Sequence, residues 1–254
     1  FQISLALERR VFRHASAVIA LGEPVKRVVV EEKGVPEDRV SVIYPGIDLD
    51  EYAHPMPPAA IPGIDPAHEV VMYIGSLVHP NQGVSMLVEA LARVFEARPQ
   101  ARAALVGGPA DAGDEYKRRL GAFGDRLVIL SGQTPEAVVA LSRRAAVLVH
   151  PRLPCRENYS VQSKIAVYLA SGRPIVATDF GDYQTLLGQT GAGRLTEATP
   201  TSLADGILAV LQNPDLAARL ASATGPVALE YFGMDRNIER YLHVYDRALA
   251  SSPR

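Results

Sequence analysis

The sequence predicts an α/β protein with a doubly wound parallel sheet, and two observations indicate this fold class. Short apolar runs rich in β-branched residues alternate with helical segments along most of the 254 residues. Five prolines between positions 55 and 66 interrupt the alternation, and such a stretch forms neither regular helix nor central strand. We therefore expect an interdomain linker at 53–67, with part of one domain before it and a larger domain after it.

The expected elements follow in order along the chain. Before the linker, 15–21 predicts a strand, 23–34 a helix ended by a glycine, and 38–46 a strand ended by Pro-Gly. After the linker, strands are expected at 69–77, 101–108, 125–132, 146–151 and 175–178. The helices expected among them are 83–97, 115–123, 135–145, an apolar segment ended by Gly172-Arg173-Pro174, 200–213 and 235–250.

Composition and charge narrow the class of protein. The chain is 48% hydrophobic and 21% charged with a formal net charge of −2, so bulk charge gives no footprint for nucleic acid or an anionic membrane. A single cysteine, Cys155, excludes an intrachain disulfide and fits a reducing compartment. No apolar run approaches the ~18 residues that a membrane span needs. The chain begins at Phe1 inside a helical pattern with no signal peptide before it, which predicts a fragment or a processed piece.

Ligands bind doubly wound sheets at the carboxyl ends of the strands, so three strand-to-helix loops are candidate sites. In the first, 73–83, Gly75 follows the strand and Gly83 opens the helix, whose free amides attract phosphate. The alternative is that these glycines only form a turn. In the second, 130–137, Gly132 and Gln133 offer a pocket for a nucleotide base, or the loop serves only to cap the following helix at Thr134.

The third candidate loop places polar side chains at the end of a strand: Asn158, Tyr159 and Ser160. Ser160 is also a candidate helix cap. Lys164, one turn further on, reaches back toward a phosphate or carboxylate, or lies on a solvated helix face. Arg152 either clamps an anion with two hydrogen bonds or pairs with Glu157.

Other reactive side chains give weaker indications. His79 and His150 both precede prolines at strand ends, where a histidine serves in acid–base chemistry or simply as a hydrogen-bonded loop residue. Cys155 lacks a Cys–His–acid pattern, and no Cys/His spacing indicates zinc. The segment 107–113, GGPADAG, does not match G-x-G-x-x-G, which disfavours a nicotinamide cofactor.

At the three loops the sequence resembles the retaining glycosyltransferases of family 4 (group 1), which have the two-domain GT-B fold. The segments VMYIGSLVHPNQGVSMLVEALARV and YLASGRPIVATD are similar to the family's donor-binding domain, and YFGMDRNIERYLHVYDRAL to its terminal helix. The resemblance covers nearly the whole chain. It implies a remnant of the acceptor-side domain at 1–52, the linker at 53–67, a Rossmann-like nucleotide-sugar-binding domain at 68–232 and a helix at 233–254 that crosses back to the first domain.

The resemblance also implies an activity: transfer of a sugar from a UDP- or GDP-linked donor to an acceptor sugar or glycolipid, with retained anomeric configuration. It implies no cofactor and no metal, because basic residues and helix amides hold the diphosphate. A cytoplasmic protein of polysaccharide or glycolipid biosynthesis is expected, free or peripheral at the inner membrane face, with no nucleic-acid partner. The donor-binding residues implied are Gly75, Ser76, Gln82, Gly83, Gly132, Gln133, Arg152, Asn158, Tyr159, Ser160, Lys164 and Val167.

The sequence departs from the family pattern in the charges around the donor. Ser76 and Gln82 replace an arginine and a lysine that often bind the diphosphate, and each lost bond is worth roughly 1.5–3 kcal/mol. Tyr159 and Val167 replace the usual glutamate pair, so the ribose contact of the second glutamate is lost. A branch of the family with a Gln-Gly loop also lacks that glutamate, and there Lys164 would supply the charge.

Two alternatives to a donor-binding glycosyltransferase chain stay open. One is a non-catalytic GT-B module that binds a nucleotide-sugar or a partner domain. The other is a GT-B epimerase, which would need acids and a histidine at the cleft. Catalytic residues are expected mainly in the acceptor-side domain, most of which we expect on another polypeptide or removed from this one, so the chain alone would bind donor weakly.

Overall fold

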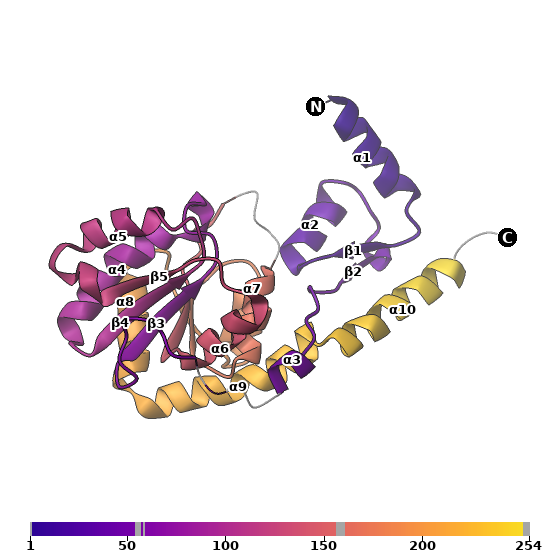
Figure 1. Ribbon diagram of the computed structural model, residues 1–254. Helices are drawn as coiled ribbons and strands as arrows, with labels where there is room; N and C mark the ends of the chain where they lie inside the picture. The colour runs from indigo at the N-terminus through magenta and orange to yellow at the C-terminus, as the bar shows by residue number, and fades with distance from the viewer. Residues whose placement is uncertain (1, 54–56, 58, 156–160, 251–254) are drawn as a thin grey trace.

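The computed structural model describes residues 2–53, 57, 59–155 and 161–250 (Figure 1). It contains a large unit built on a six-stranded sheet and a small unit built on a two-stranded sheet. The strands of the large sheet are β3 (Glu69–Ile74), β4 (Ala101–Val106), β5 (Leu127–Leu130), β6 (Val147–His150), β7 (Ile175–Thr178) and β8 (Arg194–Thr196). All neighbouring strands are parallel, which confirms the predicted fold class.

The order of the large sheet, β5-β4-β3-β6-β7-β8, fixes where a ligand would bind. The chain adds strands outward from β3 on one side and then returns to add β6 on the other side. In the register, Val71 lies opposite Val147 and Met72 opposite Leu148. The carboxyl ends of β3 and β6 therefore form the point where the strand order reverses, and a crevice opens there in sheets of this type.

Helices cover both faces of the large sheet, since alternate residues of each strand point to opposite sides (Figure 1). Val71 and Tyr73 of β3 pack into one core with α4 (Val84–Ala97), α5 (Ala112–Leu120) and α8 (Pro200–Gln212). Val70 and Met72 pack into the other core with α6 (Pro135–Arg144), α7 (Ser163–Ala170) and α9 (Pro214–Phe232). The predicted amphipathic helix at 83–97 is confirmed as α4.

The small unit contains α1 (Gln2–His14), β1 (Val18–Ala20), α2 (Glu23–Glu31), β2 (Val40–Val42) and α3 (Asp50–Ala53). Both strands are shorter than the apolar runs predicted, because a 3-10 turn at Glu37–Arg39 occupies the start of the second run. The helix ends three residues before Gly34, which adopts a left-handed conformation at φ 70°. The described part of the proline-rich segment is packed rather than free: Ile61 and Ile64 are buried in the core of the large unit.

Several elements of the large unit differ from the sequence prediction. Helix α5 begins three residues earlier than expected, and a 3-10 segment at Gly121–Arg126 follows it. The strand β8, a π-helical turn at Gln184–Gln189 and the helix α9 were not predicted. Pro226 lies inside α9, and an internal proline normally argues against a helix.

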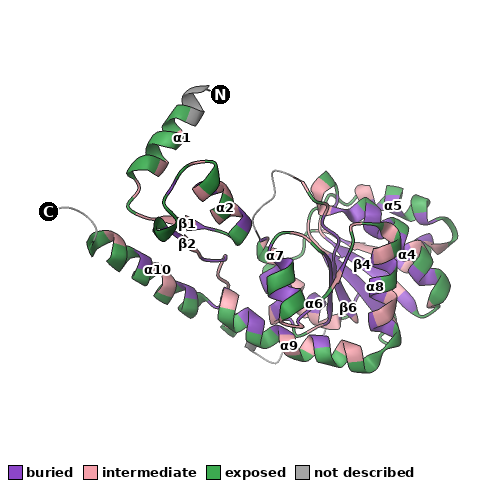
Figure 2. Ribbon diagram, turned by 180° about the vertical axis from the view of Figure 1, so that it is seen from behind, coloured by how far each residue is buried: buried purple, intermediate pink, exposed green. Residues whose placement is uncertain are grey.

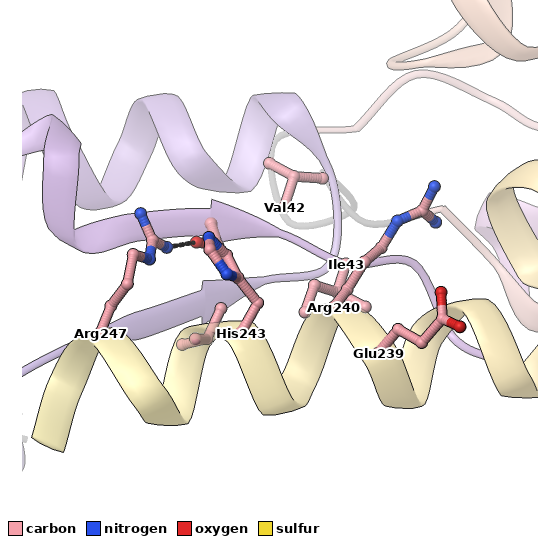
Figure 3. Close-up of a pocket in the computed structure, with 8 residues that line it drawn as sticks. Val42, Ile43, Glu239, Arg240, His243 and Arg247 are labelled. Carbon is pink, nitrogen blue, oxygen red and sulfur yellow. Dashed lines mark hydrogen bonds between the residues drawn. The ribbon is translucent and has the colours of Figure 1, made fainter.

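The chain passes from one unit to the other twice, and the units are joined at these passages. Gly233 separates α9 from α10 (Met234–Ala250) and pairs with Ile47 in an isolated parallel bridge. Helix α10 then lies along the small unit, and Asn237 donates to the carbonyl of Tyr44 at 2.8 Å. Figure 3 shows the opening of 390 Å³ between β2 and α10, across which Arg247 donates to Ser41 Oγ at 2.7 Å. The outer sides of α1 and α10 are exposed in Figure 2.

Gly83 gives a test of the close packing at the carboxyl edge of the sheet. Gly83 has φ 68°, and a Cβ there would lie 1.6 Å from the carbonyl oxygen of Pro151. Gly172 has φ 69° and nothing within 4 Å of its added Cβ, so it serves as the matched control. We expect Gly172→Ala to cost about 1–2 kcal/mol for the left-handed backbone alone. Gly83→Ala should cost at least about 2 kcal/mol more, from the backbone clash.

The measurement is urea unfolding of both variants beside the unsubstituted chain, without ligand. Equal losses of unfolding free energy for the two variants would contradict a backbone contact at Gly83.

Candidate functional site

The candidate site lies at the carboxyl ends of β3 and β6, where the strand order reverses. Four of the predicted residues meet there: Gly75, Gln82, Gly83 and Lys164. Arg152 comes shortly after β6 in the sequence. The residue before it, Pro151, has the carbonyl that Gly83 approaches. The first and third predicted loops are therefore parts of one site.

Lys164 reaches across the end of the sheet from one helical layer to the other. It stands in the first turn of α7, and its ammonium lies 4.9 Å from the centre of the Tyr73 ring, which belongs to the opposite core. Gly75 leaves the passage open, because a Cβ there would lie 2.3 Å from Lys164 Nζ. Gly75 has φ 148°, a backbone conformation that side chains rarely adopt.

Two polar groups hold the Lys164 side chain. Lys164 Nζ donates to Gln82 Oε1 and, at 3.3 Å, to the hydroxyl of Tyr73. The Tyr73 hydroxyl has two acceptors within reach of its one proton, the carbonyl of Ser76 at 2.9 Å and Gln82 Oε1 at 3.1 Å. Burial, with a smaller contribution from the charge of Arg152, lowers the pKa of Lys164 from 10.5 to about 7. Gln82, expected as a donor-binding residue that lacks the usual lysine charge, serves here as an acceptor for Lys164.

Arg152 is buried without a full set of partners. Its side chain is 1% exposed, and Nε and Nη1 make no hydrogen bond. Its guanidinium lies 5.9 Å from the ring of Phe180, and its own carbonyl accepts from Thr178 Oγ1 at 2.5 Å. Burial lowers the pKa of Arg152 from 12.5. Among the described residues no carboxylate forms an ion pair with Arg152 or Lys164.

His150 completes the basic cluster. It is 1% exposed, its Nε2 lies 2.8 Å from the Tyr183 hydroxyl, and its Nδ1 has no partner. Burial and then the charges of Lys164 and Arg152 lower the pKa of His150 well below its usual value, so the ring is neutral. Of the two roles predicted for His150, the hydrogen-bonded one is seen. His79 lies exposed before a 3-10 turn, and its carbonyl accepts from the amide of Gln82 at 3.0 Å.

The N-terminus of α4 adds backbone donors to the cluster. Gly83 precedes the helix in a left-handed conformation, and no side chain caps the first turn. Such free amides carry partial positive charge and bind anions. The backbone at Gly107, at the end of β4, lies close to the backbone at Gly75. A Cβ added to Gly107 would lie 1.9 Å from the Gly75 carbonyl oxygen. The site therefore combines a buried arginine and a half-buried lysine with a helix N-terminus.

The second predicted loop stays apart from this cluster. Gly132 and Gln133 are exposed, and the Gln133 amide donates within its own loop to the carbonyl of Ser131 at 2.9 Å. Thr134 caps α6 by accepting from the amide of Ala137 at 3.3 Å, as the structural alternative predicted. Ser76 is exposed and contributes its carbonyl to Tyr73.

Several predicted residues are placed differently or are not described. Asn158, Tyr159 and Ser160 lie outside the described residues, as does Glu157. Helix α7 has Gln162 at its N-cap position without a side-chain cap bond, and Lys164 lies in the first turn. Val167 is half-buried on α7.

The sequence prediction missed the tyrosines of the site. Tyr73, Tyr168 and Tyr183 are each at most 1% exposed and direct their hydroxyls toward the cluster or the adjoining backbone. A tyrosine within an apolar strand such as β3 could have indicated this, because a buried hydroxyl needs a hydrogen-bond partner. In the described part of the chain no group of three or more His, Cys, Asp or Glu could hold a metal ion. None of the helices described there is long and apolar enough to span a membrane.

Comparison with known families gives two matches along the chain. Residues 68–213 match the family described as glycosyl transferases group 1, and residues 2–51 match the family described as glycosyltransferase family 4. The first match alone covers more than half of the chain.

Curated relatives are identical to the chain at about a quarter of the aligned positions. A D-inositol 3-phosphate glycosyltransferase of Nocardia farcinica is 28% identical over 84% of the chain and 49% of its own length. A phosphatidyl-myo-inositol mannosyltransferase of Mycobacterium tuberculosis is 26% identical over 92% of the chain and 60% of its own length. The chain thus spans about half to three fifths of the relatives it matches.

Solved structures share the fold. A glycosyltransferase from Rickettsia africae superposes with a TM-score of 0.78 at 17% identity, over 96% of this chain and 67% of its own. The Anabaena protein HepE in complex with UDP gives a TM-score of 0.77 at 22% identity, over 93% of this chain and 65% of its own. These likenesses confirm the predicted α/β fold of GT-B type.

The pKa of Lys164 predicts how stability depends on pH. The unfolded lysine takes up its proton below pH 10.5, whereas the folded lysine does so only below about 7. The unfolded state therefore binds more protons between these values, and the free energy of unfolding falls as pH is lowered from about 10 to 7. Since Lys164 is only half-buried, we expect a loss of about 2–3 kcal/mol over this range.

Urea unfolding between pH 7 and 9.5 measures this loss, with Lys164→Met as the variant that lacks it. Lys117→Met, an exposed lysine, is the control and should follow the unsubstituted chain. Parallel pH curves for all three proteins would contradict the lowered pKa.

Proposed function

This chain belongs to the glycosyltransferases of group 1, and from that premise we propose that it supplies the donor-binding half of a sugar transferase. The donor is a nucleotide-sugar linked to UDP or GDP. The sugar passes to an acceptor sugar or glycolipid with retention of the anomeric configuration. The hydroxyl-rich inositol acceptors in the names of the two relatives fit this class of acceptor.

The observation that carries the proposal is the pair of basic side chains, buried Arg152 and half-buried Lys164, that have no carboxylate partner among the described residues. A buried cation is costly unless it is paired, and removal of a partner from a buried pair typically costs 3–5 kcal/mol. Within the described part of the chain, Arg152 keeps Nε and Nη1 without partners, and Lys164 is held by the neutral oxygens of Gln82 and Tyr73. A diphosphate would bring two negative charges to these groups and to the amides of α4. We therefore assign the diphosphate to Arg152, Lys164 and the α4 N-terminus.

The same groups would act in the reaction by stabilising the leaving diphosphate. Negative charge grows on the leaving oxygen as the bond to the sugar breaks, and fixed donors aimed at that charge lower the barrier. Lys164 would take up a proton as the diphosphate binds, because the approaching anion opposes the burial that lowers its pKa. No step requires a metal ion in this scheme. Residues that touch the acceptor are expected outside the part of the chain described above.

Nucleotide binding with coupled proton uptake tests the proposal. Calorimetry with UDP and GDP at pH 8, in buffers of different ionisation enthalpy, should show an uptake of about half a proton or more, since Lys164 is largely neutral there. Lys164→Met should abolish the uptake and weaken binding roughly 10-fold to 100-fold, from one lost charge-assisted bond.

Lys117→Met is again the control and should bind like the unsubstituted chain. No binding of either nucleotide at millimolar concentration would overturn the donor site. Binding without nucleotide release, after co-expression with an acceptor-side domain and addition of acceptor, would favour the non-catalytic module.

The valine at position 167 leads to a prediction about how the site binds the ribose. Valine cannot accept hydrogen bonds from ribose hydroxyls, so UDP and 2′-deoxy-UDP should bind within about twofold of each other. Val167→Glu should favour UDP over the deoxy form by about 5-fold or more, the value of one hydrogen bond to a charged group. Val167→Gln is the uncharged control with an intermediate preference. A strong preference of the unsubstituted chain for UDP would show that another residue reads the 2′-hydroxyl.

A further inference from the structure

A group of arginines lies at the edge of the large sheet opposite the candidate donor site. Arg143 and Arg144 end α6, shortly before β6 begins, and Arg173 comes two residues before β7. Because the strands of this sheet are parallel, their amino ends share one edge. The six residues of β3 separate this edge from the donor site by roughly 15–20 Å. A ligand at these arginines would therefore not occupy the donor site.

The three arginines line one opening of 430 Å³. Its other walls come from the proline-rich segment: Ala59, Ala60 and Pro66. Backbone and core contacts fix this segment on the large unit. The amide of Ala59 donates to the carbonyl of Ala140 in α6 at 3.2 Å, and the side chain of Ile61 is buried in the core. The opening is preformed, so a ligand would not have to order the segment in order to bind.

Main-chain carbonyls hold the guanidinium groups in place. Arg173 Nε donates to the carbonyl of Ala145, and Arg143 Nη2 donates to that of Tyr52. Arg144 Nη2 lies within 3.1 Å of the carbonyl oxygens of Asp65, Pro66 and His68. These bonds explain where the arginines stand, since cations and donors are favoured where a helix ends. They use only part of each group, because a guanidinium has five N–H donors.

Arg144 and Arg173 keep donors for a ligand. Among the described residues, no hydrogen bond involves Nε or Nη1 of Arg144 or the two terminal nitrogens of Arg173. No carboxylate there forms an ion pair with either arginine. Glu69 lines a neighbouring opening together with Arg173, but its carboxylate accepts from Arg98 Nε at 3.1 Å. Burial and then the charge of Arg144 lower the pKa of Arg173, so an anion would relieve both effects.

The geometry favours a phosphate monoester over a carboxylate. Guanidinium groups match both anions, but here they reach the opening from two segments, the end of α6 and the turn before β7. A carboxylate presents two oxygens in one plane, whereas a phosphate monoester presents three around a tetrahedron and carries about −1.5 to −2 charge at pH 7. The alanine and proline walls leave an apolar surface for the group that the phosphate esterifies.

We propose that Arg143, Arg144 and Arg173 form a second anion site, which binds a phosphate monoester carried by a small molecule or by a phospholipid head group. Arg144 and Arg173 donate to the phosphate, and Arg143 adds positive charge beside them. The site shares no residue with the donor site, so it does not rest on the proposed function.

NMR titration of the 254-residue chain with inorganic phosphate at neutral pH tests the proposal. The amide of Ala59 reports on the arginine opening and that of Gly83 on the donor site. Phosphate should shift the Ala59 signal, while sodium chloride of equal ionic strength should not, and acetate should bind severalfold more weakly. Arg173→Gln should weaken the binding seen at Ala59 about tenfold or more, from one lost charge-assisted bond. Arg118→Gln, at an exposed arginine of α5, is the control.

A second variant does not touch the arginines or their bonds. Ala60→Glu adds a carboxylate at an exposed position that lines the opening, and it should abolish the response of Ala59. Ala67→Glu, exposed in the same segment but outside the opening, is its matched control and should respond like the unsubstituted chain. Lys164→Met should also leave the response of Ala59 unchanged, because Lys164 belongs to the donor site.

Glycerol phosphate and phosphatidylcholine vesicles that contain phosphatidate distinguish the two sources of the phosphate. Binding that Ala60→Glu abolishes assigns the small molecule in the first case and the phospholipid in the second. Binding of neither overturns the assignment to a monoester, as does equal binding of acetate. No shift of Ala59 at tens of millimolar phosphate overturns the site, and so does an equal shift with chloride or in Ala60→Glu. UDP binding is measured separately, so each of these failures leaves the donor site standing.

Discussion

The side chain of Lys164 crosses from one helical layer of the protein to the other, and the rest of the site depends on this crossing. It is possible because position 75 has no side chain where the ammonium passes to Tyr73. Close backbone approaches at Gly83 and Gly107 bring α4 and β4 to the same edge. Three glycines thus bring backbone amides and a buried amine together where the strand order reverses.

The site contains basic side chains whose positive charge is not balanced by a carboxylate in the described part of the chain. Arg152 is buried beside Lys164 and neither has a carboxylate partner among the described residues. The protein limits the cost by leaving Lys164 largely neutral, with Gln82 as an acceptor. A lysine in place of Gln82 would add a third cation to this cluster. A neutral acceptor at position 82 therefore matches an amine whose pKa is lowered at position 164.

Patterns of apolar residues predicted most of the fold, because burial on two faces of a parallel sheet leaves a strong signal at β3, β4 and α4. Helix α9 was missed because Pro226 is compatible with it only in its tertiary setting. Glycines and basic residues of the site were predicted from loop positions. The bonds of Tyr183 to His150 and of Asp182 to the Glu23 amide join segments up to 159 positions apart, and no local pattern carries such information.

The balance of contacts also determines what the site would recognise. The described cluster offers cations and amides, while Val167 offers nothing to a ribose hydroxyl and Gln133 bonds within its own loop. Most binding free energy would then come from the diphosphate, since charge-assisted bonds are about twice as strong as neutral ones. We therefore expect the site to distinguish nucleotides by their number of phosphates but not by their base. A donor held mainly by its leaving group is stabilised most as that group gains charge, which places the binding energy where the reaction needs it.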